Sequence, residues 1–173
     1  MIHTLKSVAP RYEQLEDRIL LAINLGKDDE WSCWLTRRMT LGVLQRFNVF
    51  LDRTSAVTRR TSLEHRAEVA AMERDAAIES TRKAVKPIAK ETIDGVASSG
   101  ELAMELRLTP ERKGLALEIT GRAGNQARAL LNRAQLRTIL FLIQKEATKA
   151  NWVPRGGQIQ LPEPQVRIKG KMN

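Results

Sequence analysis

The residue types that could hold a metal ion stand together at one place in this sequence. Asp28, Asp29 and Glu30 form the only acidic cluster near aromatic residues, and their carboxylate oxygens could ligate a hard cation. The spacing does not match the ligand pattern of an EF-hand loop, so we interpret the cluster as a solvated turn. The two histidines, His3 and His65, do not stand in the H-E-x-x-H zinc pattern. We therefore expect no metal site.

The single cysteine, Cys33, is a potential nucleophile. It lies within an alternating apolar segment, which predicts a buried structural thiol, although a Cys–His pair stays formally open. Residues Gly95 to Gly100 have the first spacing of a phosphate-binding Walker A loop, but Glu101 stands where that loop requires lysine. The sequence therefore predicts no catalytic residue and no cofactor, and we expect a protein that is not an enzyme.

Positive charge is concentrated toward the C-terminal end of the sequence. The net charge is +9 over 173 residues, and residues 121–173 hold ten basic side chains against two acidic ones. That leaves a net charge of +8 on this third of the chain and about +1 on the first 120 residues. Such asymmetry favours an acidic partner, although lysine and arginine are also ordinary solubilising residues.

These ten basic residues form the candidate nucleic-acid-binding set, because lysine and arginine neutralise phosphates. They are Arg122, Arg128, Arg133, Arg137, Lys145, Lys149, Arg155, Arg167, Lys169 and Lys171. Aromatic residues make up only 4% of the sequence, and neither an RNP-type strand nor a helix-turn-helix spacing is present. Base stacking is therefore disfavoured, and contact through phosphates is the predicted mode.

A second candidate surface combines tryptophan with arginine. Trp31 and Trp34 point to opposite faces of one predicted strand, so at least one of them could be exposed. Trp34, Arg37 and Arg38 form the candidate protein-interaction site, because Trp and Arg dominate the energetics of interfaces. The alternative is that Trp34 packs beneath the alanine-rich segment that follows.

Alternation of apolar and polar residues predicts the strands that position these side chains. Strands are expected over residues 19–25, 31–35, 102–109 and 115–119, with a short fifth strand over 127–131. Residues 1–15 show no clear period and contain Pro10, so we expect them to be irregular.

Two helices rich in large apolar residues should cover the core. Thr36 is a suitable N-cap for a helix over residues 37–53, and Asn132 with Gln135 forms a capping box for a helix that stops near Trp152. Both helices follow a predicted hairpin, so the chain could contain two β-hairpin–helix halves, either duplicated or merely similar.

An alanine-rich, charged helix is expected between these halves, over residues 61–86. Thr61 and Glu64 have the form of a capping box, and Pro87 ends or kinks the helix. Its apolar residues form no strong stripe, so we interpret it as an exposed or partner-facing arm. Residues 95–100 then predict a flexible loop.

The expected fold is α+β: an antiparallel sheet of four to five strands covered by two apolar helices, with the helical arm and an extended basic C-terminal tail. We expect one domain over residues 1–152, made of a half at 16–53, the arm and loop at 54–100 and a half at 101–152, followed by the tail at 153–173.

The sequence predicts a cytoplasmic protein that does not enter a membrane. Its longest purely apolar run is five residues, Ile139 to Ile143, whereas a membrane span needs about 20, and one cysteine suits a reducing compartment. Two functional hypotheses follow. The first is a non-enzymatic protein that docks its basic C-terminal third on an acidic partner, with nucleic acid as the leading choice. The second is a protein–protein adaptor or assembly subunit that uses the 61–86 helix and the Trp34 surface.

Overall fold

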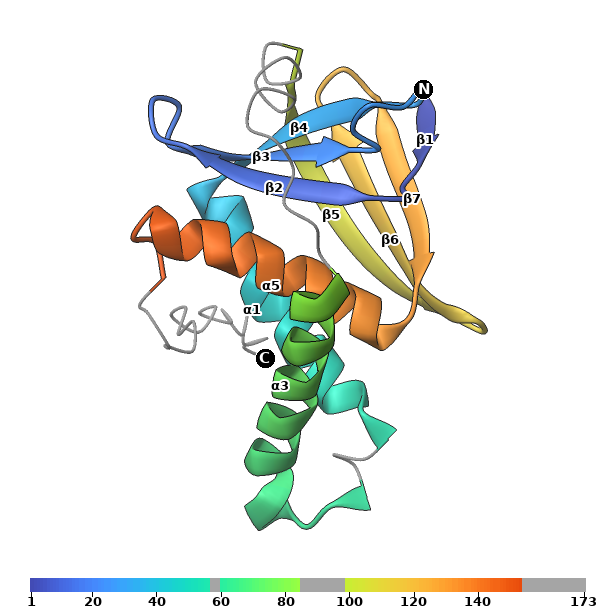
Figure 1. The fold of residues 1–173 in the computed structure, drawn as a ribbon. Helices are drawn as coiled ribbons and strands as arrows, with labels where there is room; N and C mark the ends of the chain where they lie inside the picture. The colour runs from blue at the N-terminus through green and yellow to red at the C-terminus, as the bar shows by residue number, and fades with distance from the viewer. Residues whose placement is uncertain (57–59, 85–98, 154–173) are drawn as a thin grey trace, which may run out of the picture.

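The computed structural model describes residues 1–56, 60–84 and 99–153 (Figure 1). Within these ranges the chain is an α+β protein with a seven-stranded mixed sheet and three α-helices. The strands are β1 (Ile2–Thr4), β2 (Val8–Glu13), β3 (Arg18–Ile23), β4 (Trp31–Thr36), β5 (Glu101–Glu111), β6 (Gly114–Gly121) and β7 (Gln126–Leu131). The helices are α1 (Arg37–Thr54), α3 (Arg66–Ala84) and α5 (Arg133–Lys149), with a 3₁₀ turn (Leu63–His65) before α3. The predicted tail lies outside the described residues, apart from Val153.

The prediction of four to five antiparallel strands is wrong in both number and direction. The strand order is β1-β7-β6-β5-β4-β3-β2. β1 pairs with β7 and β4 pairs with β5 in parallel, whereas the other neighbours are antiparallel. The two additional strands lie in residues 1–15, where β1 has only three residues and β2 contains Pro10. Proline is tolerated there because β2 is an edge strand.

The two ends of the sheet meet at one corner of the molecule. β1 and β2 stand at opposite ends of the strand order, yet only residues 5–7 separate them in the chain. Asn24, which is fully buried, holds this corner. Its side-chain oxygen accepts hydrogen bonds from the main-chain N–H groups of Lys6 and Ser7, and its amide donates to the Thr4 carbonyl. The sheet is therefore strongly bent, and β2–β4 cross steeply over β5–β7 in Figure 1.

α1 and α5 lie inside the bend of the sheet and complete the core (Figure 1). Both helices begin as predicted: the Thr36 hydroxyl accepts from the Met39 N–H, and Asn132 and Gln135 form both bonds of a capping box. Their most deeply buried apolar side chains are Leu44, Leu51, Leu136, Leu140, Ile143 and Ala147. Each large side chain among these contributes about 1.5–3 kcal/mol relative to an exposed position.

The alanine-rich segment forms α3, which begins at Arg66, later than the predicted start at residue 61. The 3₁₀ turn before it has Ser62 as its N-cap residue, and no side chain makes a cap hydrogen bond there. α3 packs on α5. It buries Ala70, whereas Met72 is 71% exposed. Because alanine buries little surface, Ala70 contributes little to the packing of this helix.

Each half of the fold has the same order of elements. β2, β3 and β4 form an antiparallel meander that leads into α1, and β5, β6 and β7 form another that leads into α5. The halves are joined in the sheet by two parallel residue pairs, Cys33 with Glu101 and Trp34 with Leu102. The predicted hairpin–helix halves are therefore each part of a three-stranded unit.

Candidate functional site

The candidate nucleic-acid-binding residues do not form one surface within the described part of the chain. Arg155, Arg167, Lys169 and Lys171 lie outside the described residues. Two further members are exposed, Arg122 after β6 and Lys145 on α5. The remaining four contact acidic side chains or main-chain carbonyls, as follows.

Arg128 and Lys149 form surface ion pairs. Arg128 lies on the outer face of β7, where its guanidinium is 2.6 Å from Glu111 and 3.4 Å from Glu118. Lys149 pairs with Glu146 at 2.5 Å, one turn earlier on α5. The exposed pairs of Arg128 contribute about 0–1 kcal/mol each, so Arg128 could exchange its partners for a ligand. The pair of Lys149 differs, because the Glu146 side chain is buried.

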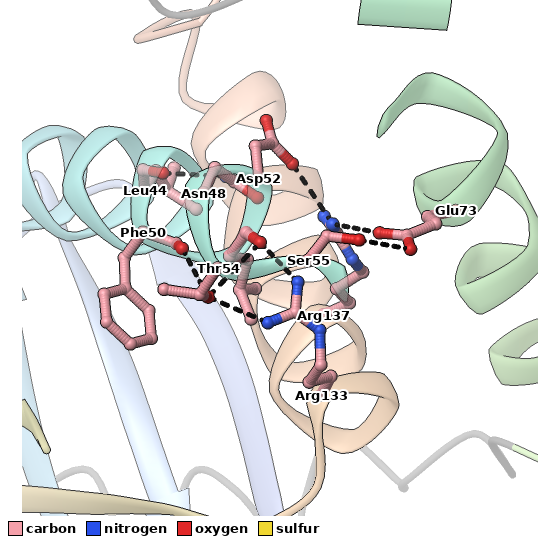
Figure 2. A network of polar contacts seen from close by, with 10 residues as sticks. Leu44, Asn48, Phe50, Asp52, Thr54, Ser55, Glu73, Arg133 and Arg137 are labelled. Carbon is pink, nitrogen blue, oxygen red and sulfur yellow. Dashed lines mark hydrogen bonds and ion pairs between the residues drawn. The ribbon is translucent and has the colours of Figure 1, made fainter. Parts of the chain in front are cut away.

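Arg137 is buried between the three helices (Figure 2). Its Nη2 group lies 3.1 Å from Asp52 on α1 and 3.3 Å from Glu73 on α3. Glu73 also accepts a hydrogen bond from the Ser55 hydroxyl at 2.7 Å. Only 6% of Arg137 is exposed, so its charge holds α3 against α1 and α5 and is withdrawn from the surface.

Arg133 is also turned inward (Figure 2). Its guanidinium donates to the Thr54 hydroxyl at 2.9 Å and to the Leu51 carbonyl, at the C-terminal end of α1. A cation is favourable there because the last carbonyls of a helix carry partial negative charge. Arg133 and Arg137 thus serve helix packing, which a count of charges along the sequence cannot reveal.

The Trp34 surface is partly covered by the chain. Trp34 is half-buried on the outer face of β4, and Arg37 and Arg38 are exposed at the start of α1. A Cβ atom built on Gly100 would lie 2.7 Å from Trp34 Nε1, so the chain just before β5 lies directly against the indole. The interaction site at Trp34, Arg37 and Arg38 stays a prediction.

Cys33 and His3 each have structural neighbours of their own. Burial, together with the nearby negative charge of Glu101, raises the pKa of the Cys33 thiol to about 12, which suppresses the reactive thiolate. His3 is buried and stacked on Trp31, with ring centroids 5.7 Å apart. Its Nδ1 atom lies 3.1 Å from the Asp29 carbonyl oxygen. Among the described residues, no group of three or more His, Cys, Asp or Glu side chains could hold a metal ion.

Glu101, at the start of β5, lies at the centre of a cluster of hydrogen bonds. Its carboxylate accepts hydrogen bonds from Trp31 Nε1 and Asn125 Nδ2, each at 2.8 Å, and from the Ala123 N–H. Burial raises the pKa of Glu101, but the bonds from Asn125, Ala123 and Trp31 together outweigh burial and hold it below its ordinary value. Gly121 lies directly beside it, so a Cβ at position 121 would displace the Glu101 carboxylate. The cluster ties together β4, β5 and the turn after β6.

A wide groove lies between the corner of the sheet and α5. Its walls are residues 2–8, residues 128–132 and α5 positions between Ala134 and Leu142, and its volume is about 1040 Å³. Nine of the seventeen lining residues are apolar, and Ile2 and Leu130 are 75% and 49% exposed. A volume at the upper end of the range of ligand pockets, with this lining, can bury a sizeable apolar ligand. The sequence analysis did not find this groove, because its three walls are far apart in the chain.

No helix in the described ranges is long and apolar enough to cross a membrane. Comparison of the chain with protein-family models, curated proteins and solved structures finds no match. The functional conclusion is therefore based on the geometry of the chain itself.

Proposed function

We propose that this protein is a non-enzymatic binding protein whose partner is a polypeptide held in the groove between β1, β7 and α5. One observation carries the proposal: a groove of about 1040 Å³ with a largely apolar lining lies beside the edge of the sheet. Exposed apolar surface of this kind is typical of interaction sites. This proposal is a form of the adaptor hypothesis. It places the contact with the partner in the groove, either in addition to α3 and Trp34 or in place of them.

Nucleic acid is the second candidate partner. The net charge of +9 favours it, as do the exposed Arg122 and Lys145. Arg133 and Arg137, however, hold helices together, and Lys149 pairs with the buried Glu146. Fewer cations are thus left to follow a phosphate backbone than the sequence suggests.

Photo-crosslinking from inside the groove tests the proposed function. The photoreactive residue p-benzoylphenylalanine replaces Leu142, which lines the groove, or Val49, which is 40% exposed on α1 and outside it. Irradiation in cells of the source organism should give a discrete adduct from position 142 alone, sensitive to protease and resistant to nuclease. The partner peptide, identified by mass spectrometry and synthesised, should bind the purified protein with at least tenfold lower affinity after Leu142→Arg.

Two results would contradict the polypeptide hypothesis. An adduct from position 142 that nuclease digests would make nucleic acid the ligand of the groove. Equal labelling from positions 142 and 49 would mean that the groove has no specific occupant.

A further inference from the structure

The edge of β7 is only partly covered by β1. β1 pairs with Gln126, Ala127 and Arg128, and the last bond of this pairing runs from the Leu5 N–H to the Arg128 carbonyl at 2.8 Å. The chain then turns away toward β2, whereas β7 continues to Leu131. Among the described residues, positions 129–131 of β7 therefore have no strand partner on this side.

The main chain of Leu130 faces the uncovered part of this edge. Successive residues of a strand direct their N–H and C=O groups to alternate neighbours. The Gln126 N–H donates toward β1, to the Met1 carbonyl, and the Arg128 carbonyl accepts from the same side. Leu130 is the next residue in this series, so its N–H and C=O are directed into the groove, where a further strand could pair with them.

The charged side chains in the lining of the groove are basic. Among the described residues that line it, Lys6 and Arg128 carry charge and none is a carboxylate. The N-terminus of α5 also opens on it, with no acidic residue in its first turn to offset the helix dipole. Lys6 and Arg128 pair with carboxylates outside the lining, but both side chains are more than half exposed, so these pairs are weak.

We infer that the ligand of the groove is an extended polypeptide segment with alternating apolar and acidic side chains, which adds as a strand beside Leu130. The inference rests on the proposed function and specifies its partner. The strand would form main-chain hydrogen bonds with Leu130, place apolar side chains against α5, and bring acidic side chains toward Lys6 and Arg128. Residues 154–173 of this chain carry four basic residues against one acidic residue, which is the wrong charge for this site.

Fluorescence anisotropy with defined peptides tests the inference on the full-length protein. The probe is a fluorescein-labelled octapeptide of alternating valine and glutamate, and the control peptide has lysine in place of glutamate. We expect the acidic peptide to bind at least tenfold more tightly than the basic one. Leu130→Pro removes the N–H that faces the groove without removing a bond to β6, and it should weaken binding at least tenfold. Leu130→Ala, which keeps the N–H, should weaken it less.

Ala134→Glu provides a second test that does not depend on Leu130. Ala134 is exposed in the groove wall, and glutamate in the first turn of a helix is favourable for the fold. It should weaken binding of the acidic peptide at least fivefold, whereas Ala134→Gln should leave binding unchanged.

The outcomes separate this inference from the proposed function. Equal binding of both peptides, or acidic-peptide binding unaffected by Leu130→Pro and Ala134→Glu, would overturn strand addition, although a crosslinked polypeptide could still occupy the groove. Dodecanoate binding in the groove without any peptide binding would make a small amphiphile the ligand. That result would overturn both the proposed polypeptide-binding function and the strand-addition inference.

Discussion

At the scale of single residues, two polar side chains, one buried and one partly buried, tie segments of the sheet together. Asn24 satisfies the main chain where β1 passes into β2, and Glu101 collects donors from three segments. Both act on the same end of the sheet, since His3 is stacked on Trp31 and Trp31 donates to Glu101. An unsatisfied buried polar group costs about 1–3 kcal/mol, so either network breaks at a measurable cost if one member is lost.

Glu101 should make the stability of the protein depend on pH. Its pKa is lower in the folded chain than its ordinary value of 4.5, so its ionised form contributes stability above about pH 4.5 and loses it as the pH falls through the folded pKa. Glu101→Gln places an amide nitrogen opposite the Ala123 N–H and should lower the free energy of unfolding at pH 7 by about 1–2 kcal/mol. Urea unfolding between pH 3 and 7 measures the difference.

The difference between wild type and Glu101→Gln should shrink as the pH approaches 3. Glu105→Gln is the matched control, because Glu105 is exposed and forms a surface ion pair with Arg107. Parallel pH profiles for wild type and Glu101→Gln would show that this carboxylate does not contribute to the acid sensitivity.

At the scale of elements, a buried charge network connects α3 to α1 and α5. Glu73 on α3 accepts from Ser55 and pairs with Arg137, whose buried Nη1 has no hydrogen-bond partner within the described part of the chain. A buried cation that loses one of its two carboxylates is expensive, because the remaining partner must compensate it alone.

Glu73→Ala should therefore loosen α3 and lower the free energy of unfolding by about 2–3 kcal/mol. Amide hydrogen exchange of residues 66–84 should accelerate more than exchange in α1 or α5. Asp75→Ala on the same helix is the control, since Asp75 is exposed, and should change neither quantity. Unchanged exchange in α3 after Glu73→Ala would mean that the ion pair does not hold the helix.

The elements with a strong local signal are the ones that sequence predicted. Alternation located β3 to β7, and the side chains of Thr36, Asn132 and Gln135 located the starts of α1 and α5. β1 and β2 were missed because neither shows a clear alternation of apolar and polar residues: β1 has only three residues, and β2 is an edge strand that contains Pro10. The parallel pairings were missed because they join residues distant in sequence, which no local pattern encodes.

At the scale of the whole molecule, net charge is a weaker guide to partners than the placement of each charge. The ten basic residues were found by counting, but burial of Arg137 and the inward turn of Arg133 depend on tertiary contacts. The groove could not be predicted from the sequence either, because its three walls come together only in the folded chain.

Nucleic-acid binding should accordingly be weak and sensitive to salt. We expect labelled duplex DNA, single-stranded DNA and RNA to bind in low salt and to dissociate near physiological salt, as measured by anisotropy. A chain ending at Val153 lacks four basic residues of the candidate set, and each lost phosphate contact would reduce the salt slope by about 0.9. Affinity that persists in physiological salt and falls on truncation would favour the nucleic-acid function instead.

The junction between β1 and β2 also fixes when the fold can be completed during synthesis. β1 can pair only after β7 has been synthesised, and the apolar faces of β3 and α1 can be covered only after α5 has been synthesised. About 100 residues are added between α1 and the end of α5, which takes roughly 5–20 s at ordinary translation rates. For that interval the nascent chain displays an incomplete core, so we expect that a ribosome-associated chaperone would bind it until β1 can pair with β7.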